Sequence, residues 1–116
     1  MNHPQTKRYV IHKHTRGNNI HWDLMIECGE VLKTWRLNEP PEKLAGQKTR
    51  AIAIQDHNKK FLAYQGPVNN NTGTAEIADK GTCTIESDDG KILKIIFNGE
   101  ILKTQIVLEV VKNYAG

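Results

Sequence analysis

The chain has 116 residues, which is the size of a single domain. Hydrophobic residues make up 38% and charged residues 25%, a composition that indicates a soluble globular protein and excludes a disordered one. No apolar run approaches the ~20 residues of a membrane-spanning helix. The first residues contain no apolar signal core, and the two cysteines form no CxxC pair. We therefore expect one cytoplasmic domain over residues 1–116, with a flexible tail at residues 1–7 and nothing that requires more than a monomer.

The net charge of +3 is unevenly distributed along the chain. Residues 1–22 contain four basic side chains and no acidic one: Lys7, Arg8, Lys13 and Arg16. The remaining residues are nearly neutral. A basic segment of this kind suits an anionic partner such as a phosphate ester or nucleic acid, and a solvated arm is the alternative interpretation.

The predicted elements are mostly short strands. Residues 9–14 and 20–27 favour strands, and in the second segment polar and apolar residues alternate cleanly. A turn at residues 28–30 leads into a strand at 31–37 and, after two prolines, into a short helical turn within 42–47. A strand at 50–55 is followed by a short apolar segment at 61–64 and by loops at 65–67 and 69–73 that are rich in Gly, Pro and Asn.

The last third of the chain predicts strands at residues 75–78, 82–86, 91–97 and 100–111. Asn98-Gly99 lies between two apolar runs and is the strongest hairpin signal in the sequence. No long amphipathic helix and no repeat is found. Seven to nine short strands with minor helical turns predict an all-β fold, a small antiparallel barrel or a curled sandwich.

His21 and Asp23 are the most informative polar residues. At positions i and i+2 of a strand they project from one face, opposite the side of Trp22. His14 ends the preceding strand, so a hairpin would bring it back towards His21, and His12 is a spare candidate. Two histidines and a carboxylate would form a metal site with open positions. A hydrogen-bonded pair on a solvated face is the alternative.

His57 follows a predicted strand and has two interpretations. It is either an imidazole that binds phosphate or donates a proton near a metal, or an exposed loop histidine. The sequence contains no phosphate-binding GxxxxGK[ST] loop and no serine nucleophile elbow. Seven aromatic residues are too few to favour a base-stacking surface.

Several segments, in this order, resemble the 3′-phosphoesterase domain of DNA ligase D. The resemblance rests on residues 9–14 (YVIHKH), 20–27 (IHWDLMIE), 31–35 (VLKTW), 56–57 (DH), 64–68 (YQGPV), 73–74 (GT) and 81–82 (GT). It covers roughly residues 8–110, so the chain would be a stand-alone version of that domain.

The resemblance implies a small β-barrel that removes 3′-phosphates or 3′-terminal ribonucleotides from DNA and leaves a 3′-hydroxyl for ligation. It also implies a divalent metal, most often manganese, held by His14, His21 and Asp23, with His57 as a further active-site residue. DNA 3′ ends would be the substrate, and a separately encoded DNA ligase or polymerase a possible partner. Lys13, Arg16 and Arg50 are expected to contact phosphates.

The chain also departs from the family pattern. Met25 stands where the family has an arginine, Phe61 where it has a tyrosine, and Gln55 where it has an acid. Met25 and Phe61 cannot donate hydrogen bonds to a phosphate, so the activity is left open. Two alternatives therefore remain: a binding module for DNA ends or for a ligase or polymerase, and a metal-binding barrel that acts on an unrelated small molecule.

Overall fold

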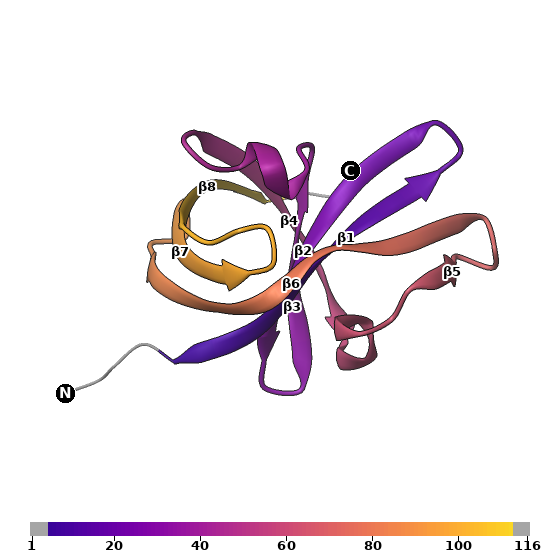
Figure 1. The fold of residues 1–116 in the computed structure, drawn as a ribbon, viewed down its shortest axis with the longest axis horizontal. Coiled ribbons are helices and arrows are strands. Elements are labelled where there is room, and N and C mark those ends of the chain that lie inside the picture. Colours follow the sequence, from indigo (N-terminus) through magenta and orange to yellow (C-terminus); the bar gives the residue numbers. More distant parts are fainter. Residues whose placement is uncertain (1–4, 113–116) are drawn as a thin grey trace.

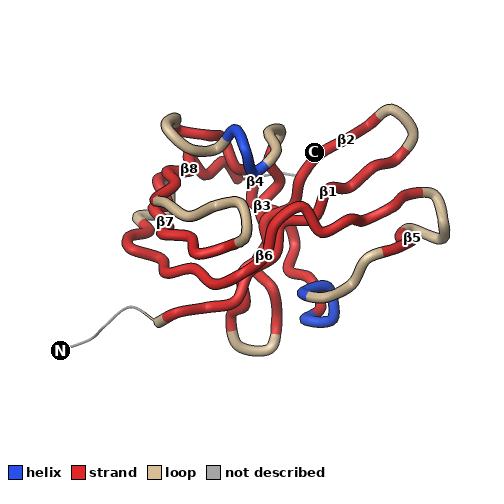
Figure 2. Tube along the Cα trace, in the orientation of Figure 1, coloured by secondary structure: helices blue, strands red, loops and turns tan. Residues whose placement is uncertain are grey.

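The computed structural model describes residues 5–112, and residues 1–4 and 113–116 lie outside the described part. The strands are β1 (Thr6–Arg16), β2 (Asn19–Cys28), β3 (Val31–Leu37), β4 (Lys48–Asn58), β5 (Gly66–Val68), β6 (Gly73–Asp88), β7 (Ile92–Gly99) and β8 (Gln105–Lys112). Two 3-10 turns, η1 (Pro41–Lys43) and η2 (Lys59–Leu62), are the helical segments of this part of the chain (Figure 2). Neither has the length and apolar character needed to cross a membrane.

Seven strands close into a barrel, which confirms the predicted all-β fold. The order β1-β2-β3-β4-β8-β7-β6 returns to β1 through the β1–β6 pairing, and β5 pairs with β6 outside this ring (Figure 1). Strand directions cannot alternate all the way around a ring with an odd number of members. One pairing must therefore be parallel, and this is β4 with β8. The prediction of a purely antiparallel barrel was wrong in this respect.

The barrel interior holds the main hydrophobic core. Tyr9, Leu24 and Phe97 are buried there, and the rings of Tyr9 and Phe97 meet edge to face with centroids 4.7 Å apart. Trp22 and Trp35 pack against this core, as their alternation with polar residues predicted. The residues that point inward along β1 and β2 are therefore the apolar half of each alternating strand.

A second, smaller cluster lies on the outer face of the same strands. Val10, Met25 and Leu32 are buried there beneath Phe61 and Leu62 of η2. In Figure 1 the segment that carries η2 and β5 runs beside the first half of β6, with which β5 pairs. The outer face of β1 and β2 is thus partly covered, and this arrangement shapes the candidate site.

The reversal between β7 and β8 differs from the sequence prediction. Asn98 and Gly99 are the last residues of β7 rather than a two-residue hairpin turn, and the chain reverses over residues 100–104. The buried Asp79 carboxylate accepts the backbone N–H groups of residues 100, 101 and 102 and thereby holds this loop. A Cβ at Gly99 would lie 1.8 Å from the hydroxyl oxygen of Tyr9, so close packing explains the glycine.

Several strands are longer than predicted, and β6 and β1 are two examples. β6 is continuous from Gly73 to Asp88, although the sequence predicted two separate strands, because its first half pairs with β1 and β5 and its second half with β7. β1 begins at Thr6, so Thr6 and Lys7 of the expected tail belong to a strand. The first four residues of that expected tail lie outside the described residues.

Candidate functional site

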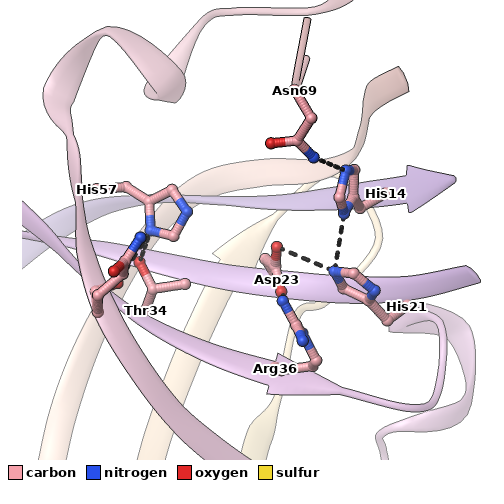
Figure 3. A network of polar contacts seen from close by, with 8 residues as sticks. His14, His21, Asp23, Thr34, Arg36, His57 and Asn69 are labelled. Atoms are coloured by element: carbon pink, nitrogen blue, oxygen red, sulfur yellow. Dashed lines mark hydrogen bonds and ion pairs between the residues drawn. The ribbon is translucent and has the colours of Figure 1, made fainter. Parts of the chain in front are cut away.

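The β1–β2 hairpin brings His14, His21 and Asp23 together. In the antiparallel register His14 lies opposite His21, and His12 lies opposite Asp23. His14 Nδ1 is 3.0 Å from His21 Nε2, and His21 Nε2 is 3.4 Å from Asp23 Oδ2. Figure 3 shows these three side chains converging on one face of the two strands. The pairing follows from strand alternation and a short turn, as the sequence predicted.

The environment of this cluster keeps His21 neutral and Asp23 enclosed. Burial lowers the pKa of His21, although Asp23 opposes the effect. Asp23 is only 6% exposed, and Arg36 Nε from β3 lies 3.5 Å from its Oδ1. A neutral imidazole and a carboxylate oxygen are the forms in which these groups bind a metal.

The donor set fits a divalent metal ion. One ligand atom from each of His14, His21 and Asp23 lies within 4.8 Å of the other two. Ligands bound at about 2.1 Å from one ion are about 3.0–3.4 Å apart in octahedral or tetrahedral geometry. The two short distances in the cluster are of that size. Asp23 Oδ2 is the carboxylate oxygen on the His21 side, whereas Oδ1 faces Arg36 Nε at 3.5 Å. Two imidazoles and a carboxylate suit Mn²⁺, Fe²⁺ or Zn²⁺.

The cluster opens into a pocket of about 560 Å³ on the outer face of the barrel. The β1–β2 hairpin lines one side of it, and β4, η2, β5, the loop before β6 and the start of β6 line the remainder. The described lining residues are His12, His14, Asp23, Met25, Gln55, His57, Lys60, Phe61, Tyr64, Pro67, Val68, Asn69, Asn70, Asn71 and Ala75. The pocket is large enough for a phosphate group and part of a nucleotide.

His57 lines the same pocket but lies apart from the cluster. It is within β4, not in a loop after the strand, and its Nδ1 lies 2.9 Å from Thr34 Oγ1 and 3.1 Å from the Gln55 carbonyl oxygen. The Thr34 hydroxyl itself donates to the Leu32 carbonyl, and a carbonyl can only accept. The neutral ring of His57 therefore carries its proton on Nδ1, the nitrogen that faces Thr34 in Figure 3, and Nε2 carries none.

Three consecutive asparagines form the far rim of the pocket. Asn69, Asn70 and Asn71 have φ angles of 54°, 57° and 67°, a left-handed conformation that asparagine tolerates better than most residues. Thr72 closes the turn by donating its backbone N–H to the Asn69 carbonyl. Asn69 Nδ2 lies 3.3 Å from His14 Nε2. An amide nitrogen only donates, so this contact is a hydrogen bond only when the His14 proton is on Nδ1. The sequence predicted only a loop here.

Three positions that depart from the family pattern lie in the pocket wall. Met25 is 2% exposed and packs with Val10 and Leu32, while Phe61 packs over the same cluster. Gln55 is exposed at the pocket edge. The part of the pocket floor formed by Met25 and Phe61 is therefore apolar and offers no hydrogen-bond donor.

The predicted phosphate-binding cations lie outside the pocket lining. Lys13 is between His12 and His14 and so projects from the opposite face of β1, while Arg16 is exposed at the end of that strand. Arg50 is exposed on β4. Ile52, two residues further along that strand, pairs with Arg36 of β3. None of these three residues lines the pocket.

The basic segment is also partly neutralised. Arg8 donates two hydrogen bonds to Glu27, and Lys59 Nζ lies 3.1 Å from the same carboxylate. These two cations lower the pKa of Glu27 to about 2. Arg8 is therefore less available to an anionic partner than the sequence suggested.

The sequence alone did not single out Lys60 or Asn69, used Tyr64 only within the family resemblance, and left His12 as a spare candidate. Asn69 lies in a predicted loop and Lys60 between predicted segments, and no local pattern distinguishes either from a solvated residue. His12 is 2% exposed and its buried Nε2 has no hydrogen-bond partner in the described chain. Burial lowers its pKa, with Asp23 opposing.

The fold and the site define a class: a small barrel with a histidine- and aspartate-lined pocket on its outer face. Comparison with protein families identifies the class further, because the model of the DNA ligase D 3′-phosphoesterase domain matches residues 11–110. The chain belongs to this family, as the resemblance predicted. The family implies a phosphoesterase, that is a hydrolase, with a general role in healing 3′ ends. No curated protein matches the sequence significantly.

Proposed function

We propose that this protein is a Mn²⁺-dependent phosphoesterase that removes a 3′-phosphate or a 3′-terminal ribonucleotide from DNA. The product would be a 3′-hydroxyl that a ligase can use. The observation that carries the proposal is the convergence of His14, His21 and Asp23 at a pocket that also contains His57, in a chain of the 3′-phosphoesterase family.

Each of these residues has a distinct role in the proposal. An ion held by His14, His21 and Asp23 would stabilise negative charge on a phosphate oxygen. Asp23 supplies the only carboxylate of the cluster, and Arg36 and His21 fix its orientation. With an ion on Nδ1, His14 Nε2–H would donate to Asn69, whose amide oxygen would then have to face it. The protein therefore contributes a preorganised set of ligands, which lowers the cost of binding.

His57 is proposed as the proton donor. Because Thr34 and the Gln55 carbonyl accept from Nδ1, the ring is held with Nε2 available to the pocket. When His57 is protonated, Nε2–H can donate to a phosphate oxygen or to the leaving oxygen.

The DNA strand would approach along the exposed cations. Arg16 and Arg50 are exposed on β1 and β4 and can bind backbone phosphates beside the pocket. Lys13 projects from the opposite face of the hairpin and would contact phosphates there. Such contacts would position the 3′ end without reading its sequence.

The test is end cleavage on two primer–templates, one with a 3′-phosphate and one with a 3′-terminal ribonucleotide. Purified protein with MnCl₂ should convert at least one of them to a 3′-hydroxyl product, and EDTA should stop the reaction. Asp23→Asn should lower the rate at least ~100-fold, because it removes the charged ligand. Glu30→Gln, an exposed change in the β2–β3 turn, is the matched control. No product with Mn²⁺ on either end would contradict the proposal.

A second function is favoured by the apolar floor at Met25 and Phe61. The same pocket could hold a DNA 3′ end, or the surface could dock on a separate ligase or polymerase, with little catalysis. Met25→Arg distinguishes the two, since a new donor should raise turnover if the missing donor limits the rate. Tight binding of a 3′-phosphorylated end without turnover in either form would favour the binding module.

A further inference from the structure

The pocket needs positive charge beyond the metal cluster if it is to hold a phosphate dianion. Asp23 places a carboxylate at the pocket wall, and this charge repels an incoming phosphate. Met25 and Phe61 form an apolar floor without donors. Lys13, Arg16 and Arg50 do not line the pocket.

Lys60 is the one permanently cationic side chain among the described residues that line this pocket. The adjacent Lys59 is 36% exposed and forms an ion pair with Glu27. Lys60 forms no ion pair within residues 5–112, and its Nζ lies 5.3 Å from the centroid of the Phe61 ring. Its ammonium group can therefore bind an anion in the pocket.

The backbone of η2 holds Lys60 at this place. Asn58 caps the turn, and its side chain accepts the backbone N–H of Lys60 at 2.9 Å. The next residues, Phe61 and Leu62, pack on the outer cluster over Val10 and Met25. The short helical turn beside β5 in Figure 2 is thus fixed at both of its ends, and Lys60 is presented from a defined position.

We infer that Lys60 binds the phosphate group of the substrate in this pocket and supplies the cation that its floor lacks. The inference rests on the proposed function and names a residue that the sequence pattern did not single out. Lys60 would act as a point charge opposite the metal cluster, so that the phosphate lies between two positive groups.

The test measures equilibrium binding in MnCl₂ of an oligonucleotide ending in a 3′-methylenephosphonate, in which carbon replaces the scissile oxygen. The same strand with a 3′-hydroxyl end is the reference. Lys60→Met should reduce the preference for the phosphonate end about 10- to 100-fold, the range for losing a hydrogen bond to a charged group. Lys60→Arg should retain the preference, and Lys59→Met should change it less than about threefold.

Mn²⁺ affinity, measured by calorimetry, should be the same in all three variants, because none of them alters a ligand. If Lys60→Met binds the phosphonate end as well as Lys59→Met does, the role of Lys60 is refuted while the proposed function stands. If the unmodified protein itself shows no preference for the phosphonate end, the role of Lys60 and the proposed removal of 3′-phosphates are both refuted.

Discussion

The substitution Asp23→Asn tests whether the Asp23 carboxylate binds a metal ion or only stabilises the fold. The change keeps the shape of the side chain and one acceptor oxygen but removes the charge. In the metal-free protein Asp23 is held by His21 and by Arg36, whose side chain is 41% exposed. An ion pair with this much exposure contributes about 0.2–1 kcal/mol, so the free energy of unfolding should fall by no more than about 1 kcal/mol.

The loss of Mn²⁺ affinity should be much larger than this. Altering a group that merely supports a ligand costs about 10- to 100-fold in metal affinity, so removing the only carboxylate ligand should cost at least about 100-fold. Calorimetric titration with MnCl₂ and urea denaturation without metal measure the two effects, and Glu30→Gln is the control. A dissociation constant within about threefold of the unmodified protein would refute the assignment of Asp23 as a ligand.

Three further predictions concern the barrel and its titrating groups. Gly99→Ala should lower the free energy of unfolding, measured by urea denaturation, by about 2–4 kcal/mol, because the new Cβ displaces the Tyr9 hydroxyl from Asp79. A loss below about 1 kcal/mol would contradict the close packing. Burial raises the pKa of the Cys83 thiol to about 12, so a thiol reagent at pH 8 should titrate the half-buried Cys28 first and Cys83 only after unfolding; rapid reaction of both would count against it. Burial lowers the pKa of His12 and His21, so the unfolded chain takes up protons before the folded chain does as the pH falls below about 6.5. The urea midpoint of the metal-free protein should therefore drop between about pH 7.5 and 5.5. An unchanged midpoint would oppose this.

The sequence predicted the part of the site that depends on local strand geometry. His14, His21 and Asp23 belong to one hairpin, and strand alternation with a short turn is sufficient to place them on one face. The inward-facing residues, such as Leu24 and Ile26, followed from the same alternation. The family resemblance added the expected roles, but it did not add the distances.

The rest of the site depends on contacts between distant segments. His57 enters the pocket because β4 pairs with β3, and its tautomer depends on Thr34 and the Gln55 carbonyl. Lys60 and Asn69 reach the pocket because η2 and β5 cover the outer face of β1 and β2. Periodicity within one segment carries no information about which other segment covers it.

The wrong predictions about topology have the same origin. Asn98-Gly99 is a strong local turn signal, yet the loop that follows it is held by Asp79 on β6, a contact far away in sequence. The parallel β4–β8 pair follows from closing seven strands into a ring, which no single strand pattern reveals. Contacts between distant segments therefore determine both the loop after Gly99 and the parallel β4–β8 pair, whatever the local sequence favours.

The central claim is that His14, His21 and Asp23 form the metal centre of a 3′-end-healing site. An anomalous difference map at the manganese absorption edge, from crystals soaked in MnCl₂, tests it most directly. We expect one strong anomalous peak between His14 Nδ1, His21 Nε2 and an Asp23 carboxylate oxygen, at the pocket that also contains His57. A peak elsewhere on the protein, or none at saturating Mn²⁺, would contradict it.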